Sequence, residues 1–165
     1  MIILGVDPGS RLTGWGILEA RGPAFTRHVD NGVIALGNGA LPARLLKLMN
    51  SLEMIVSKYG PNVVAVEGVF TAKNARSALV LGHARGVALL VAAKNSLDVF
   101  EYAPAKIKKA IAGSGRAEKF QVQTALQLVL GLPEPAQADA ADALAVAFCH
   151  ASNMCREKIL KGVST

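Results

Sequence analysis

The stretch that decides the fold is MIILGVDPGSRLTGWG, residues 1–16. Its first six residues are almost entirely apolar, and the run then breaks into Asp7-Pro8-Gly9-Ser10. A short apolar run bounded by turn residues is typical of a strand buried on both faces of a central sheet. Asp7 is therefore expected at the carboxyl end of that strand, where ligands gather in open α/β sheets. Asp-Pro-Gly is also ordinary turn chemistry, so this stretch alone leaves open a purely local role for Asp7.

Length and composition favour a single soluble α/β domain with an anionic partner. The chain has 165 residues, of which 52% are hydrophobic and only 5% aromatic, which is normal for helices packed on a parallel sheet. A formal net charge of +6 suits a polyanion such as nucleic acid. Cys149 and Cys155 match no zinc or redox spacing and are expected to be free thiols. No signal peptide or membrane-spanning run is recognised, so a cytoplasmic location is predicted.

Apolar runs, helical stripes and turn residues together predict five strands and five helices. The predicted strands are residues 1–6, 13–19, 25–34, 63–67 and 98–102. The predicted helices are residues 41–59, 73–94, 104–112, 118–130 and 137–150. Short turns join the first three strands into an antiparallel meander, whereas helical crossovers make the later strands parallel to the first. The expected fold is a mixed five-stranded α/β sheet with helices on both faces, formed by residues 1–150 and followed by a flexible basic tail over residues 151–165.

Four carboxylates fall where this fold would bring them to one edge of the sheet. Two predicted parallel strands end in acid, at Asp7 and Glu67, and the last helix carries Asp139 and Asp142 on one face. Such a cluster is costly when ionised and unpaired. Helix capping is an alternative explanation for Asp139. All four acids together predict a site for one or two divalent cations, and ligands that are all oxygen favour Mg²⁺ or Mn²⁺ over zinc.

A pair of metal ions on carboxylates indicates a particular reaction. Two ions about 4 Å apart hydrolyse phosphodiesters, because one activates water and the other stabilises the leaving oxygen. Together with the positive charge of the chain, this predicts a nuclease. The lysines at positions 106, 108 and 109 lie on one predicted basic helix, and by itself a run of this kind is usually only a solvated face.

Four blocks of the sequence resemble the RuvC family of Holliday-junction resolvases. They are GVDPGSRLTGWG, VEGVFTAKNARSALVLGHARG, GSGRAEKFQVQ and QADAADALA, and they follow the family's order and spacing over about residues 2–150. The resemblance implies an RNase H-like fold, a homodimer, and a Mg²⁺-dependent enzyme in which Mn²⁺ can substitute. It also implies four-way junction DNA as the substrate and the RuvA–RuvB branch-migration complex as a partner.

The resemblance implies roles for individual residues. The acids Asp7, Glu67, Asp139 and Asp142 would be the metal ligands, and Lys119 would join them as a catalytic residue. An aromatic ring just beyond the second acid, Phe70, would stack on bases near the crossover, although an aromatic after a strand is more often a core residue. Gly68 stands where the family pattern has Gln. The cations expected to contact DNA are Lys73, Arg76, Lys108, Arg116 and Lys119.

We therefore expect an endonuclease that resolves Holliday junctions in homologous recombination and DNA repair. Paired nicks in two strands of like polarity would leave 5′-phosphate and 3′-hydroxyl ends. The small residues of helix 73–94, including Ala88, are expected at the dimer contact. One alternative is a phosphotransferase of the actin and sugar-kinase type, which also begins with Asp-x-Gly-Ser/Thr but needs a second domain. The other is a junction-binding protein without catalysis, which would not need the four acids.

Overall fold

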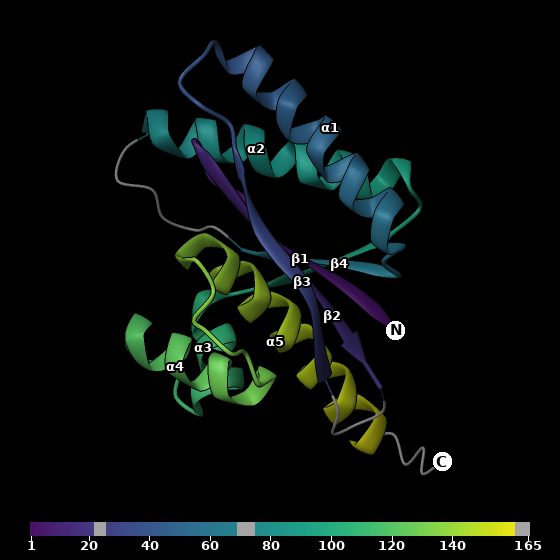
Figure 1. Ribbon diagram of the computed structural model, residues 1–165, viewed down its shortest axis with the longest axis vertical. Helices are drawn as coiled ribbons and strands as arrows, with labels where there is room; N and C mark the ends of the chain where they lie inside the picture. The colour runs from purple at the N-terminus through teal and green to yellow at the C-terminus, as the bar shows by residue number, and fades with distance from the viewer. Residues whose placement is uncertain (22–25, 69–74, 161–165) are drawn as a thin grey trace.

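The computed structural model describes residues 1–21, 26–68 and 75–160 (Figure 1). One five-stranded sheet runs through it in the order β3-β2-β1-β4-β5. Neighbours are antiparallel among the first three strands and parallel among β1, β4 and β5. This arrangement confirms the predicted meander and the predicted parallel half. The strands are β1 (Ile2–Asp7), β2 (Leu12–Ala20), β3 (Thr26–Ala35), β4 (Val63–Glu67) and β5 (Asp98–Tyr102).

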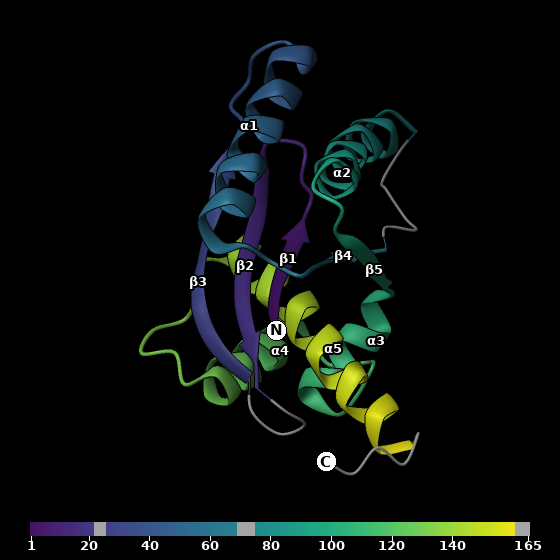
Figure 2. The same cartoon turned by 90° about the vertical axis from the view of Figure 1, so that its right-hand side faces the viewer.

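Helices cover both faces of the sheet, as Figure 2 shows from the side. Two of them, α1 (Leu41–Tyr59) and α2 (Ala75–Lys94), lie on one face. The other face carries α3 (Pro104–Ala112), α4 (Lys119–Leu130) and α5 (Ala138–Leu160). The alternation of side chains along each strand divides the core accordingly. Leu4, Val6 and Ile17 face α1 and α2, whereas Ile3 and Leu18 face the other three helices.

The helices begin and end at the residues that physical chemistry favours. Pro42 occupies the first turn of α1, where its missing N–H has no intrahelical partner in any case. Gly60 ends α1 in the left-handed region at φ 53°, and its N–H donates to the carbonyl oxygen of Val56 at 2.9 Å. At the start of α4 the backbone N–H of Glu118 donates to Gln121 Oε1 at 2.9 Å, which fixes the direction of the helix.

The last helix is longer than its predicted range of 137–150. It continues to Leu160, so the predicted basic tail over residues 151–165 begins as helix. The polar composition after His150 suggested fraying, but no Gly or Pro interrupts the chain before Gly162. Asn153 also supports the extension, because its Nδ2 donates to the carbonyl oxygen of Cys149 at 2.7 Å. The last residues, 161–165, lie outside the described part.

Within the described ranges, α2 is the one helix long and apolar enough to cross a membrane by length and composition. The window is Ser77–Lys94, with a mean hydropathy of 1.3. Its inner face belongs to the core, because Ala84 and Ala88 are almost fully buried there. Arg85, in the middle of the window, forms an ion pair with Glu101 of β5. These contacts are those of a helix in a globular domain, so the window is weak evidence for a membrane span.

Candidate active site

Two acids stand at neighbouring strand ends, as the sequence predicts. Asp7 is the last residue of β1 and Glu67 is the last residue of β4. The strands are parallel, with Val6 opposite Val66, so both carboxylates leave the sheet at the same edge. Both side chains are half-buried. This edge is the carboxyl end of the parallel strands, where the fold leaves room for ligands.

Glycines in β1 and β2 bring α5 directly onto this edge. A Cβ atom added at Gly14 would lie 1.8 Å from the carbonyl oxygen of Asp139, and one at Gly5 would lie 2.0 Å from that of Ala143. Gly14 also pairs with Asp7 across the β1–β2 ladder. The backbone of α5 therefore touches the sheet beside Asp7. This role of Gly14 was not predicted from the sequence, although two glycines spaced by two residues on one strand face, at positions 14 and 16, carry the signal.

The four acids form one electrostatic cluster. Burial is the largest cause that raises the pKa of Asp7 to about 7, and the charges of Asp142, Glu67 and Asp139 raise it further. Burial and the charge of Asp142 also raise the pKa of Glu67. Like charges hold protons because neutralising one carboxylate relieves the repulsion on the others. The structure therefore brings together the four acids that the sequence singles out.

Lys119 supplies the opposite charge. Its Nζ donates to Asp142 Oδ2 at 2.7 Å, and this hydrogen bond is the first cause that raises the pKa of Lys119. The charge of Lys119 in turn acts to lower the pKa of Asp7. Lys119 is the first residue of α4, whose first turn is fixed by Glu118 and Gln121. The start of α4, which lies on the same face of the sheet as α5, thus places Lys119 at the acid cluster.

A small cavity adjoins the acids on the α3 and α4 side. Its volume is about 210 Å³. Lys108 of α3 is half-buried along its wall, and its charge acts to lower the pKa of Glu67. Polar and apolar groups therefore share the lining, with both signs of charge present. The lining residues are Glu67, Pro104, Ile107, Lys108, Lys119, Val122, Asp142 and Ala145.

The structure describes the side chains of only some of the other predicted DNA contacts. Phe70 and Lys73 lie outside the described residues, and Arg76 lies in α2 at a position where only the backbone is described. Arg116 is exposed just before α4, and its backbone N–H donates to Ser114 Oγ at 3.2 Å. Lys108, Arg116 and Lys119 therefore lie on or beside the two helices that flank the acid cluster.

A larger groove lies elsewhere, between α1 and the edge strand β3. It has a volume of about 880 Å³, and its lining includes Trp15, Met54 and Tyr59. The rings of Trp15 and Tyr59 lie 5.9 Å apart at a tilt of 37°. Among the residues that the structure describes, no predicted site residue lines this groove, so size alone would have pointed away from the acids.

The carboxylates suit a hard divalent cation by their chemistry. All four offer oxygen ligands, which Mg²⁺ and Mn²⁺ prefer. Besides burial, repulsion from the other three acids raises the pKa of Asp7, and a bound cation would relieve that repulsion. In residues 1–21, 26–68 and 75–160, no three His, Cys, Asp or Glu side chains are already placed to hold a metal ion together. The ammonium group of Lys119, 2.7 Å from Asp142 Oδ2, balances part of the negative charge of the cluster.

The metal-free protein is expected to lose stability at Asp7 as the pH rises. Because the folded-state pKa of Asp7 is about 7 against an ordinary value of 3.8, the folded chain binds this proton more tightly than the unfolded chain. That contribution is complete below pH 3.8 and is lost as the pH rises through 7. The free energy of unfolding of Asp7→Asn, measured relative to that of the native protein, should therefore rise by roughly 2 to 3 kcal/mol from about pH 5 to about pH 8.

Urea denaturation of both proteins in EDTA at the two pH values measures this difference. The comparison isolates Asp7 from carboxylates such as Glu19 and Glu53, whose pKa values are lowered by partners and whose contributions have the opposite sign. Parallel stability profiles for the two proteins would contradict the assignment.

The strand order and the helices on both faces define an RNase H-like α/β fold, here with an acidic centre at the ends of β1 and β4. Residues 3–150 match the family model described as crossover junction endodeoxyribonuclease RuvC, and the chain belongs to that family. It is 52% identical over 164 residues to the crossover junction endodeoxyribonuclease RuvC of Geobacter sp. (strain M21), with 99% of each chain covered. Identity to the relative from Syntrophotalea carbinolica is also 52%, over 92% of this chain and 94% of the relative.

A solved relative supports the same conclusion. The structure described as T. thermophilus RuvC in complex with Holliday junction substrate is similar, with a TM-score of 0.90 and 30% sequence identity. The match covers 95% of this chain and 96% of that chain. The predicted family, the RNase H-like fold and the nuclease class are confirmed. Membership of this family decides against both the phosphotransferase and the junction-binding protein without catalysis.

Proposed function

We propose that this chain resolves Holliday junctions by paired hydrolytic nicks in two strands of like polarity. The observation that carries the proposal is the cluster of four carboxylates around Asp7 in a chain of this family. The T. thermophilus relative, solved with a Holliday junction substrate, supports four-way DNA as the substrate. The products would be 5′-phosphate and 3′-hydroxyl ends that a ligase can seal in recombination and repair.

The site is proposed to work with Mg²⁺, in one or two copies, and Mn²⁺ is expected to substitute. Asp7, Glu67, Asp139 and Asp142 would hold the metal. When bound, it would activate the attacking water and stabilise the leaving oxygen. Asp7 stands nearest the centre of this set, because the other three acids all act on its pKa. We therefore expect Asp7 to contribute most to metal binding.

The cations around the acids would position the DNA. Lys119 is held by Asp142 at 2.7 Å, so its ammonium group already lies at the centre and can turn to a phosphate that arrives there. In that position it would offset the negative charge that develops on the phosphorus oxygens. Lys108 and the exposed Arg116 would hold flanking phosphates, which raises affinity for any sequence. Lys73, Arg76 and the base-stacking Phe70 remain predictions from the sequence.

A cleavage assay on synthetic DNA tests the proposal. Four-way junctions and linear duplexes of the same arm sequences are incubated with the protein in Mg²⁺ and in EDTA. We expect symmetric nicks in the junction in Mg²⁺, and intact DNA in EDTA and for the duplex. Religation by a DNA ligase checks the chemistry of the ends. Cleavage in EDTA, or equal cleavage of the duplex, would contradict the proposal.

A homodimer is proposed through the outer face of α2. Two symmetric cuts need two active sites, which a two-fold dimer supplies. On α2, Leu79 is 65% exposed and Leu90 is 59% exposed, and these residues border a shallow groove of about 570 Å³. Added Cβ atoms at Gly82 and Gly86 would meet no atom within 4 Å, so a second backbone has room to approach. Exposed leucines beside small residues are typical of a surface that another protein covers.

Leu79→Glu together with Leu90→Glu should convert the dimer to a monomer. The two introduced carboxylates would be desolvated and uncompensated at the contact, which should weaken dimerisation by at least about a hundredfold. Sedimentation velocity measures the change, and Leu128→Glu on α4 is the control because Leu128 is 76% exposed on another helix. An unchanged dimer would refute this placement. Ala88, the position predicted from the sequence, is 3% exposed and faces the protein's own core, so its substitution would test folding instead.

The remaining parts of the proposal concern the cellular setting. We propose a cytoplasmic location, which suits a DNA-processing enzyme of this family, and the RuvA–RuvB complex as the partner that the family implies. Copurification with those two proteins on a junction would test the partnership.

A further inference from the structure

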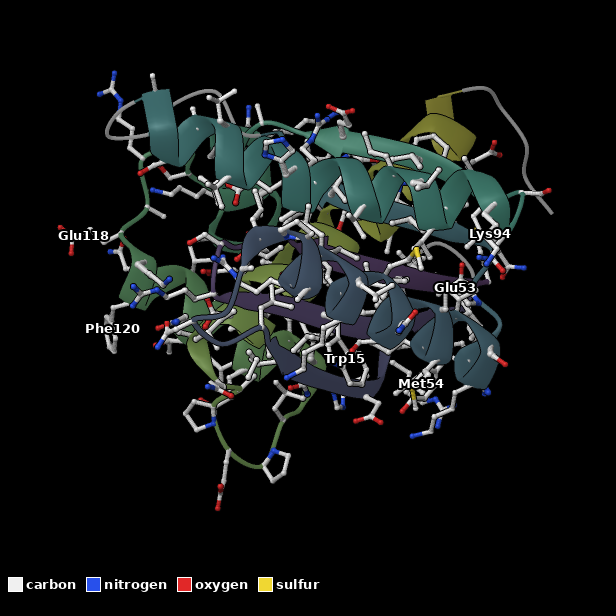
Figure 3. The ribbon with its side chains drawn as sticks, turned by 90° about the horizontal axis from the view of Figure 1, so that it is seen from above. Trp15, Glu53, Met54, Lys94, Glu118 and Phe120 are labelled. Carbon is white, nitrogen blue, oxygen red and sulfur yellow. The ribbon has the colours of Figure 1, made fainter. Side chains whose placement is uncertain are left out.

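An aromatic side chain projects into solvent at the start of α4, one residue after Lys119. Phe120 is 74% exposed and follows Lys119 directly at the start of α4. Figure 3 shows it next to Glu118 at the margin of the molecule, pointing away from the ribbon. Single exposed apolar residues are normal on protein surfaces. What distinguishes Phe120 is the neighbour that it has in sequence, because Lys119 reaches Asp142 of the catalytic cluster.

The direction of the ring is set by the rest of α4. Val122 and Leu126 are buried against the core and hold the opposite side of the helix. Phe120 lies two residues before Val122, which is about 200° around the helix. The bond from the Glu118 N–H to Gln121 Oε1 fixes the first turn. The ring is therefore presented to solvent by a fixed helix end.

Charged residues of both signs precede the ring in the sequence. The exposed Arg116 precedes it by four residues, the exposed Glu118 by two, and Lys119 adjoins it in the sequence. A DNA strand whose phosphate lies at Lys119 and the acids would carry its neighbouring nucleotide past Phe120. Aromatic rings flanked by cations are the combination that binds unpaired bases, because the ring stacks on the base while the cations hold the backbone. Such unpaired bases arise where strands exchange at a junction.

We propose that Phe120 stacks on an unpaired base next to the scissile phosphate and so helps to position the strand for cutting. This inference rests on the proposed function. Phe120 contacts the nucleotide that flanks the reacting phosphate and takes no part in the chemistry itself. The stacking is tolerant of sequence, since every base has an aromatic face, so it contributes to affinity and alignment rather than to the choice of sequence.

The test uses the cleavage-inactive Asp7→Asn protein and junctions with a single 2-aminopurine at each position flanking the cut. We expect the protein to change the fluorescence at one of these positions, and Phe120→Ser to abolish that change. Junction affinity should fall about five- to a hundredfold in the Ser variant. Phe120→Trp should restore both readouts. Leu128→Ser is the matched control, because Leu128 is 76% exposed on the same helix and should alter neither.

Two kinds of failure are distinguishable. If the native protein cuts junctions but Phe120→Ser keeps the fluorescence change, or keeps junction affinity within twofold of native, the stacking role is wrong and the proposed function stands. If the native protein neither binds nor cuts junctions, both fall together. Circular dichroism of Phe120→Ser checks that α4 is still folded, and a loss of both readouts that Phe120→Trp fails to restore also overturns the stacking role.

Discussion

Asp7→Asn is expected to lower junction cleavage in Mg²⁺ by about a thousandfold or more while junction binding is kept. Asn retains the size of Asp and one of its oxygens, so the fold is undisturbed. It removes the charge at the point where the other three acids act. A metal ion held at this point would lose its strongest attraction, whereas Lys108, Arg116 and Lys119 would still hold the DNA backbone.

Single-turnover cleavage and junction binding in Ca²⁺ measure the two halves of this prediction. Asp98→Asn is the matched control, since Asp98 is exposed at the start of β5 and should leave both unchanged. Melting curves with and without Mg²⁺ provide a readout that is independent of activity. The native protein should be stabilised by Mg²⁺, and the Asp7→Asn protein much less. Native cleavage rates in the Asp7→Asn protein would rule out the proposed metal site.

Gly14→Ala should both destabilise the protein and stop cleavage. A methyl group at Gly14 would lie 1.8 Å from the carbonyl oxygen of Asp139, far inside contact distance. The obstacle is backbone, so α5 must move away from the sheet and take Asp139 and Asp142 with it. Overpacking of this kind costs about 3 kcal/mol. A displacement of even an ångström at the catalytic acids should lower cleavage about a hundredfold in the fraction that remains folded.

Urea denaturation gives the stability, and cleavage per folded molecule gives the catalytic effect. Gly39→Ala is the control, because a Cβ at Gly39 meets no atom within 4 Å and its φ is not in the left-handed region. The control should behave as the native protein does. Equal stability of Gly14→Ala and the native protein would show that α5 does not need this close approach.

Most of the fold and the acid cluster could be predicted because each has a local signal. The apolar run before Asp7 and the one before Glu67 identify two buried strands, and the topology then brings their ends together. The pair of Asp139 and Asp142 on an apolar helix is equally visible in the sequence. Polar composition after His150 was a weaker guide, because it does not stop a helix that lacks Gly and Pro.

Other features depend on contacts between elements, which a one-dimensional pattern does not specify. The bond from Lys119 to Asp142 joins residues 23 apart in sequence, through the orientation of α4 against α5. Ala88 belongs to a helix whose small residues lie on more than one side, so composition did not show which side meets the core. The contact of Gly14 with α5 likewise appears only when the helix is placed on the sheet.

In the proposed function, the bond between Lys119 and Asp142 would make DNA and metal cooperative ligands. An ammonium group that turns toward a phosphate leaves Asp142 with its negative charge uncompensated, and the acid cluster then attracts a cation more strongly. By reciprocity, a cation at the acids would release Lys119 for the phosphate, and DNA would bind more tightly. We therefore expect full assembly of the proposed centre to follow the arrival of the strand to be cut.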